Sequence, residues 1–268
     1  MTSLAGAVQA VDSNELLESL RAKGSHGPPA GHHSAELSSA GAAILLDRRL
    51  ERSEPALRDA VGIPSVSKVY LFAKRATDII GSLFVLTLLS PVIAVIAALI
   101  KFSDGGPVFY PHVRVGKWGR EFRCLKFRTM VVNADHLKPE IAHLNTHEDE
   151  RTFKVPDDPR ITRIGRLLRR SSLDEVPQLW NVLKGSMSLV GPRPPVVQEV
   201  ELYDLDDMQR LMVKPGLTCI WQVSGRSRLP FPKQLELDLA YIQNRTYWLD
   251  LKLMLKTIPA VFSADGAY

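Results

Sequence analysis

The longest apolar run in the chain occupies residues 79–100 and contains no charged side chain. A helix needs about 20 apolar residues to match the hydrocarbon core of a bilayer, so this run predicts a membrane helix. Ser90 and Pro91 stand in its middle. Because a proline inside a helix removes a backbone hydrogen bond and clashes with the preceding turn, we expect a bend there. The Ser90 hydroxyl can bond a carbonyl that the bend leaves free.

Basic residues flank this run on both sides: Lys74 and Arg75 precede it, and Lys101 follows it. Two topologies are therefore open, a kinked span that crosses the membrane and a re-entrant hairpin that returns both ends to one face. Positive charge at both ends slightly favours the re-entrant hairpin, because basic flanks resist translocation. A buried helix of a soluble protein is the third interpretation, but no polar residue marks an outward face.

The next periodic stretch, residues 108–130, alternates apolar and polar positions around a turn at 116–119. This pattern predicts a β-hairpin. Its returning strand carries Lys126 and Arg128, two positions apart, which places both cations on the same face of a strand. The alternative is an exposed basic edge that opposes aggregation.

Residues 159–170 combine five arginines with apolar residues at helical spacing. Ile161, Ile164, Leu167 and Leu168 are expected on one helical face. The pattern is typical of a basic amphipathic helix on an anionic membrane surface, or of an ordinary helix packed on the core. Nucleic-acid binding is a further alternative, although no aromatic residues for base stacking accompany the arginines.

The following segment has the serine-x-x-glutamate spacing of a capping box, from Ser172 to Glu175. It predicts a helix that begins there, turns an apolar face formed by residues 179–183 inward, and ends at Gly185. Asp174 and Glu175 would then lie at a helix start, where backbone N–H groups favour negative charge.

The adjacent acids Asp174 and Glu175 allow two interpretations. In the first, Glu175 is only a cap and the preceding Arg169 and Arg170 are solvated. In the second, the cations hold a phosphate while one carboxylate attacks it. Neighbouring helical positions point about 100° apart, which suits two separate tasks, such as those of a nucleophile and a metal ligand.

The last third of the chain holds three loop segments with a cation beside glycine. Gly191-Pro-Arg-Pro-Pro forms a rigid turn that presents Arg193, and residues 214–218 and 221–226 are similar. Glycine allows the backbone to approach a phosphate closely. Helices are expected at 235–243 and 249–258.

The composition adds limits on compartment and partners. The chain has 268 residues, 34 Lys and Arg against 29 Asp and Glu, a net charge of +5 and a pI near 9.2. This excess suits polyanionic partners such as nucleic acid, anionic lipid or phosphorylated substrates. The two cysteines, Cys124 and Cys219, exclude a disulfide scaffold and a zinc ribbon. Residues 1–67 lack apolar periodicity, so a disordered tail without a secretory signal is expected.

Five motifs, in this order along the chain, together resemble the bacterial sugar transferase family. These are the monotopic polyprenyl-phosphate phosphoglycosyl transferases that start exopolysaccharide, capsule or O-antigen repeat units. The resemblance covers residues 74–257. The motifs are Ile161-Thr-Arg-x-Gly-Arg, Ser172-Leu-Asp-Glu-x-Pro-Gln-Leu-Trp-Asn, Ser188-Leu-Val-Gly-Pro-Arg-Pro, Lys214-Pro-Gly-Leu-Thr and Trp221-Gln-Val-Ser-Gly-Arg.

The resemblance implies transfer of a sugar-1-phosphate from a UDP-sugar to undecaprenyl phosphate, with release of UMP, through a covalent phosphosugar–enzyme. It implies that Asp174 is the nucleophile and that Glu175 binds Mg²⁺. It also implies that Ser90 and Pro91 form the break of a re-entrant membrane helix. The positions assigned to substrate binding are Lys126, Arg128, Arg169, Arg193, Arg226 and Asp250.

The implied fold is α+β: a mainly helical monotopic membrane enzyme with a small β-hairpin and interfacial amphipathic helices. We expect a disordered tail (1–67), a re-entrant helix (68–103) in inner-membrane lipid and a catalytic domain (104–268) facing the bacterial cytoplasm, with no nucleic-acid partner. Pro111-His112 stands where relatives often have Arg-Gln, which puts substrate contacts near His112 in question. The alternatives are a hydrolase acting on the same substrates and a non-catalytic scaffold or nucleic-acid-binding protein.

Overall fold

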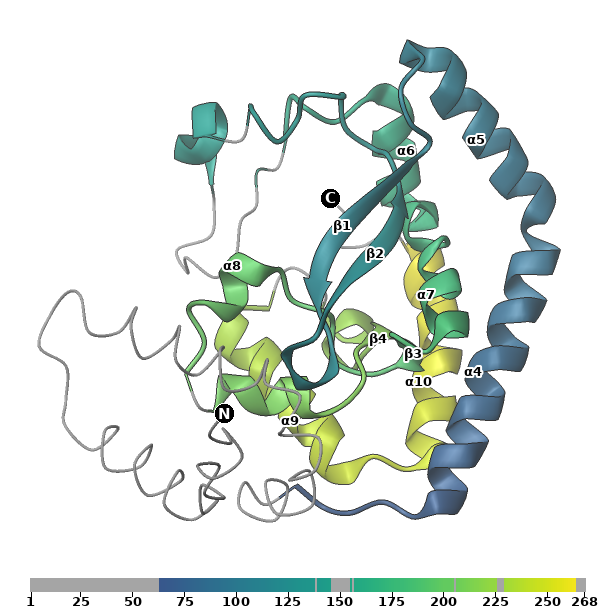
Figure 1. Cartoon of the computed structure of the whole chain (residues 1–268), viewed down its shortest axis with the longest axis vertical. Coiled ribbons are helices and arrows are strands. Elements are labelled where there is room, and N and C mark those ends of the chain that lie inside the picture. The colour runs from purple at the N-terminus through teal and green to yellow at the C-terminus, as the bar shows by residue number, and fades with distance from the viewer. Residues whose placement is uncertain are drawn as a thin grey trace, which may run out of the picture.

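The computed structural model describes residues 63–137, 139–145, 155, 157–204, 206–225 and 229–263. Helices dominate, with two small two-stranded sheets between them, so the predicted α+β class is confirmed. Figure 1 shows two long helices, α4 and α5, along one side of the molecule and the hairpin β1–β2 near its middle. Most of the predicted tail, residues 1–62, lies outside the described part. Ile63 is buried in the largest apolar cluster.

Helices α4 (Lys68–Leu88) and α5 (Ser90–Asp104) form the predicted bent apolar element. Their axes differ by 62° at the break. Pro91 lies in the first turn of α5, where its missing N–H costs no helix hydrogen bond. The Ser90 hydroxyl donates to the Thr87 carbonyl at 2.8 Å, as expected for a helix end that must satisfy its own backbone.

Neither of these helices alone has both the length and the apolar character to cross a bilayer, nor has any other helix in the described residues; α4 and α5 meet that requirement together. Both leave large apolar side chains exposed. They include Ile80, Leu83, Phe84, Leu88, Val95, Leu99 and Phe102.

One polar face of α4 attaches it to the rest of the molecule. The Arg75 guanidinium donates to the carbonyls of Val182 and Leu183, each at 2.7 Å, at the end of helix α7 (Gln178–Lys184). A cation at a helix C-terminus satisfies unpaired carbonyls and opposes the negative end of the helix dipole. One turn later, Asp78 accepts a hydrogen bond from the Leu189 backbone. Successive turns of α4 are therefore bonded to the end of α7 and to Leu189, four residues beyond Gly185.

The hairpin forms where alternation predicted it, with strands β1 (Phe109–Val115) and β2 (Glu121–Phe127) joined at Lys117–Gly119. Trp118 and Gly119 both adopt positive φ, 61° and 72°, which allows the short connection. Phe127 packs with Ile96 and Ile100 of α5, so the apolar end of β2 rests on the bent helix pair.

Helix α6 (Arg163–Arg170) is shorter than expected, and Thr162 caps its N-terminus with a hydroxyl that accepts from the Gly165 backbone. The predicted apolar face is only partly right. Leu168 is buried against α5, whereas Leu167 is exposed.

The predicted helix start at Ser172 is wrong. Ser172 has φ 56° and ψ 15°, a left-handed conformation in which no side-chain cap forms. A single 3₁₀ turn (Leu173–Glu175) follows, and α7 begins only at Gln178. A capping box needs an extended serine, so the left-handed backbone excludes it. The predicted end is confirmed, because Gly185 caps α7 with φ 85°.

The remaining elements enclose the largest apolar cluster. Strand β3 (Ser188–Val190) pairs in parallel with β4 (Gly216–Thr218), and helix α8 (Val197–Val200) lies between them in the chain. Helices α9 (Phe231–Asn244) and α10 (Tyr247–Ser263) confirm the two predicted near the C-terminus and are longer. This cluster joins Val190 of β3 to Tyr241 of α9 and Leu253 of α10.

Candidate active site

The acid pair lies in the 3₁₀ turn between α6 and α7. Asp174 is 8% exposed, and Glu175 points back to the end of strand β2. The left-handed Ser172 before the pair is a backbone conformation that costs about 1–3 kcal/mol in a residue other than glycine. Such strain is typical of functional sites.

Cations from two other parts of the chain meet this pair. Lys126 Nζ lies 2.7 Å from Glu175 Oε1 and 3.8 Å from Asp174 Oδ2. Arg193, presented by the loop after β3, reaches the same Glu175 oxygen at 3.4 Å. The structure therefore brings together four of the predicted site residues when Arg193 is counted with Lys126 and the two acids.

These surroundings shift the pKa values of the two carboxyl groups in opposite directions. Burial raises the pKa of Asp174, although Lys126 draws it in the opposite direction. Burial would also raise the pKa of Glu175, but the charges of Lys126 and Arg193 outweigh it and lower that pKa to about 2. Glu175 is thus a fixed anion at neutral pH, whereas Asp174 holds a proton more strongly than an ordinary aspartate. Two adjacent acids with different environments suit two different tasks.

Arg169 completes this side of the site from the last turn of α6. Its Nε donates to Thr129 Oγ1 at 3.0 Å. Burial lowers the pKa of Arg169, and the negative charge of Asp174 partly offsets this effect. Guanidinium groups remain protonated even so, which makes Arg169 a third positive charge near the buried aspartate.

The sequence model of the bacterial sugar transferase family matches residues 69–264. The chain belongs to this family. It is 46% identical over 199 residues to the exopolysaccharide production protein ExoY of Rhizobium meliloti, covering 73% of this chain and 88% of that protein. The transferase class predicted from the sequence is thereby confirmed at the level of the family.

Longer relatives match the same part of the chain. The UDP-galactose-lipid carrier transferase of Erwinia amylovora and the undecaprenyl-phosphate galactose phosphotransferase of Salmonella typhimurium are each 45% identical over 200 residues. The alignment covers 74% of this chain and 42% of each of them, so the sugar transferase chain spans less than half the length of these two relatives.

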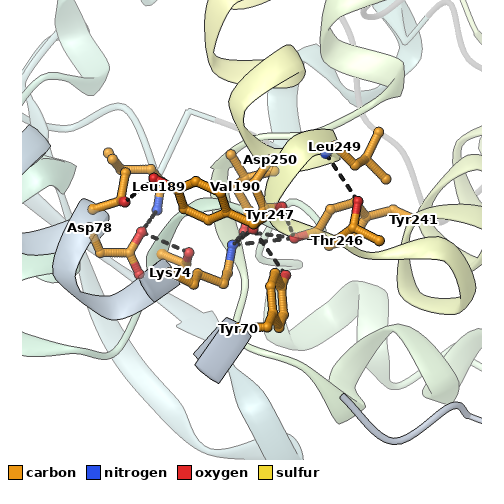
Figure 2. A network of polar contacts seen from close by, with 12 residues as sticks. Tyr70, Lys74, Asp78, Leu189, Val190, Tyr241, Thr246, Tyr247, Leu249 and Asp250 are labelled. Atoms are coloured by element: carbon orange, nitrogen blue, oxygen red, sulfur yellow. Dashed lines mark hydrogen bonds and ion pairs between the residues drawn. The ribbon is translucent and has the colours of Figure 1, made fainter. Parts of the chain in front are cut away.

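The structure places two predicted substrate-binding residues of this family member apart from the acid pair. Arg128 follows β2, and its guanidinium binds Asp104 at the end of α5 and the Pro107 carbonyl. It is 6% exposed. Asp250 lies in α10, where Tyr70, Lys74 and Tyr241 surround its carboxylate (Figure 2). A third predicted residue, Arg226, lies outside the described residues.

Sequence reasoning missed Tyr110 and Arg114, which line the same face of the hairpin as Lys126, and noted His112 only as a departure from the family pattern. The register places Tyr110 opposite Lys126, His112 opposite Cys124 and Arg114 opposite Phe122. Side chains of directly paired residues share one face, so the period-two alternation from Lys126 contained the signal. Arg114 also donates to the Pro194 carbonyl at 2.9 Å, which fixes the hairpin to the loop that presents Arg193.

The hydrogen bond between Arg114 and His112 determines the protonation of the histidine. Arg114 Nε donates to His112 Nδ1 at 2.9 Å. Because a guanidinium nitrogen only donates, Nδ1 carries no proton and the single ring proton lies on Nε2. Burial, together with Arg114 and Lys126, lowers the pKa of His112 to about 4. His112 is therefore a neutral donor beside the cationic cluster.

The position of α7 relative to the hairpin depends on one buried amide. Asn181 Nδ2 donates to the Arg123 carbonyl at 2.7 Å, and its Oδ1 accepts from the Leu125 backbone at 2.9 Å. Asn181 is 5% exposed. This amide bonds α7 to the strand segment directly before Lys126, and so holds the acid pair and its main cation in register.

We expect Asn181→Ala to lower the free energy of unfolding by about 1–3 kcal/mol, because two buried backbone groups lose their partners. Thermal unfolding of the purified protein would measure the loss as a lower Tm. Lys184→Ala, an exposed change on the same helix, is the matched control and should stay within about 0.5 kcal/mol of the wild type. Equal Tm values for both variants would contradict a structural role for Asn181.

Proposed function

We propose that the chain transfers a sugar-1-phosphate from a UDP-sugar to undecaprenyl phosphate and releases UMP, as the first step of exopolysaccharide or related glycan assembly. The names of its relatives support the two substrate classes. The observation that carries the proposal is the buried Asp174 carboxyl beside Lys126, with Glu175 held as an anion by Lys126 and Arg193.

The reaction proceeds in two displacements. In the first, an Asp174 oxygen bonds to the β-phosphorus of the UDP-sugar, and the bond from that phosphorus to the bridging oxygen breaks, which releases UMP. In the second, a phosphate oxygen of undecaprenyl phosphate attacks the same phosphorus, and the Asp174 carboxylate leaves. A covalent intermediate divides a difficult transfer between two bulky substrates into two simpler ones.

The cations make the first displacement electrostatically possible. A diphosphate repels an approaching carboxylate, so positive charge must lie where the negative charge develops. Lys126 contacts both acids, Arg193 lies 3.4 Å from Glu175, and the charges of Arg169 and Arg193 both act on Asp174. These groups come from a strand, a helix and a rigid loop, so they are in place before the substrate binds. We therefore assign phosphate binding to them.

The acid pair also fits a magnesium ion that is shared between the protein and the substrate phosphates. Mg²⁺ is usually held by one or two carboxylates together with substrate phosphates and water. Within the described part of the chain, no group of three or more His, Cys, Asp or Glu side chains could hold a metal by itself. Glu175 would hold the ion jointly with the diphosphate. When bound, Mg²⁺ would supply additional positive charge at the phosphates.

We further propose that α4 and α5 enter the cytoplasmic leaflet of the bacterial inner membrane as a re-entrant pair. The uncharged residues before and after the break number about ten on each side, or ~15 Å of helix at 1.5 Å per residue. Each arm is therefore about half as long as the ~30 Å hydrocarbon core is thick. The 62° bend and the exposed apolar side chains of both helices support this placement. It would bring the site to the surface where a soluble and a lipid substrate meet.

Product analysis tests the proposed function. The purified protein, a panel of UDP-sugars and undecaprenyl phosphate should give UMP and a lipid-linked sugar diphosphate in equal amounts, and excess chelator should stop the reaction. Free sugar phosphate without a lipid product would show a hydrolase instead. Undiminished turnover with excess chelator would contradict the magnesium assignment.

A further inference from the structure

A buried polar cluster lies where α4 meets α9, α10 and the end of β3 (Figure 2). Its centre is Asp250, which is 3% exposed. Tyr70 and Lys74 each donate to Asp250 Oδ2 at 2.9 Å, and Tyr241 donates to Oδ1 at 2.7 Å. Both carboxylate oxygens are thus bonded within the protein. A carboxylate in this state has almost no surface to offer a nucleotide, so its contribution must be indirect.

Lys74 connects this cluster to the backbone of β3. Its Nζ, besides binding Asp250, donates to the Val190 carbonyl at 2.8 Å. The Tyr241 hydroxyl also lies 3.3 Å from the Val190 carbonyl, but it has a single proton, which it donates to Asp250 Oδ1 at 2.7 Å. Lys74 is therefore the principal donor to the Val190 carbonyl. One turn along α4, Asp78 accepts from the Leu189 backbone at 2.8 Å. Successive turns of α4 therefore hold successive residues of β3.

Val190 is followed directly by the loop that presents Arg193, and this loop has little freedom. The Gly191 backbone donates to the Thr218 carbonyl at 3.0 Å. A Cβ on Gly191 would lie 2.5 Å from the Lys214 carbonyl oxygen, so the backbone at Gly191 packs directly against the backbone at Lys214. A shift of Val190 is consequently transmitted to Arg193, which lies 3.4 Å from Glu175.

We propose that Lys74 and Asp250 are positioning residues that set Arg193 against the acid pair through the Val190 carbonyl. Asp250 fixes the Lys74 ammonium by charge, and Lys74 fixes the backbone. The position of α4 against β3 is thereby coupled to the position of Arg193 relative to Glu175. This inference rests on the proposed function, because it assigns Arg193 to that reaction.

The test separates the backbone contact from the charge balance. Lys74→Met removes the donor to Val190 and leaves Asp250 buried without its cation, so both Tm and kcat should fall. The double variant Lys74→Met with Asp250→Asn removes the unpaired charge and should recover most of the Tm. Its kcat should stay about 10- to 100-fold below the wild type, because a displacement of about 1 Å at a catalytic group costs up to about 100-fold.

Tyr70→Phe is the matched control. It removes one hydrogen bond from Asp250 and leaves the Val190 carbonyl with its donor, so kcat should stay within about twofold of the wild type. The rate is read as UMP release from a UDP-sugar with undecaprenyl phosphate present, and KM for the UDP-sugar is measured alongside. We expect the loss in the double variant to appear in kcat, with KM changed less than threefold.

Three results would overturn the proposal. The double variant could have the kcat of the wild type, its Tm could be no higher than that of Lys74→Met, or Tyr70→Phe could lose as much kcat as the double variant. The wild-type reaction distinguishes this failure from failure of the proposed function. If the wild type releases no UMP, the proposed function is wrong. If it releases UMP normally and the double variant matches it, only the positioning role is wrong.

Discussion

Asp174→Asn is expected to lower the rate of sugar-phosphate transfer by about 10⁴-fold or more, since removing the proposed nucleophile would disable the whole catalytic unit. The amide has the same shape as the carboxyl group, so it fits the buried site. It lacks the negative charge needed to bond the β-phosphorus. Glu175 cannot replace it, because its carboxylate is held by Lys126 at 2.7 Å and by Arg193. UMP release at saturating substrate measures the loss.

Folding and nucleotide binding serve as controls for this variant. The Tm of Asp174→Asn should equal or exceed that of the wild type, because burial already disfavours the charged form of Asp174. Its affinity for UMP should be similar to the wild-type value. A variant that keeps more than a tenth of the wild-type rate would remove Asp174 from the role of nucleophile.

Lys126→Met should reduce turnover at neutral pH by about 100- to 1,000-fold, the effect of removing one preorganised charge from a reacting centre. The same change should move the acidic limb of the pH–rate profile to higher pH. Lys126 lowers the pKa of both Asp174 and Glu175. Without it both values rise, so the carboxylates become ionised, and the enzyme active, only at a higher pH.

Lys233→Met provides the control for this prediction. Lys233 pairs with Glu236 on the exposed surface of α9, so the substitution changes the same net charge away from the site. Its profile should match that of the wild type. An acidic limb that stays in place in Lys126→Met would show that Lys126 does not set the ionisation of the acid pair.

The sequence predicted the parts of the fold that depend on neighbouring residues. The hairpin followed from alternation around the turn at residues 116–119, and the helix break followed from Pro91. Both are local effects, since a strand period and a missing N–H act within a few residues. The helices near the C-terminus were found for the same reason, with boundaries that differ by a few residues.

The helix start was missed because two effects outside the local pattern decided it. Ser172 adopts a left-handed backbone, and Glu175 bonds Lys126, which is 49 positions earlier in the chain. A full charge at 2.7 Å competes successfully with a capping hydrogen bond to a backbone N–H. The spacing of serine and glutamate contains no information about a distant lysine.

The grouping of the two acids with Lys126 and Arg193 was predictable from the sequence, and their roles stay predictions. Lys126 and Arg193 meet Glu175, as their motifs suggested, whereas Arg128 turns to Asp104 because β2 ends at Phe127. Once the strand has ended, alternation no longer determines where a side chain points. The pairing of Arg128 with the end of α5 depends on how that helix packs, which local patterning does not encode.

Mass spectrometry of the enzyme mixed with a UDP-sugar, without undecaprenyl phosphate, tests directly whether Asp174 becomes covalently modified. We expect one sugar-phosphate adduct per chain, located on the peptide that contains Asp174, together with an equal amount of UMP. Adding undecaprenyl phosphate should remove the adduct, and Asp174→Asn should never acquire it. UMP release without an adduct, or the same adduct on the Asp174→Asn protein, would contradict the mechanism.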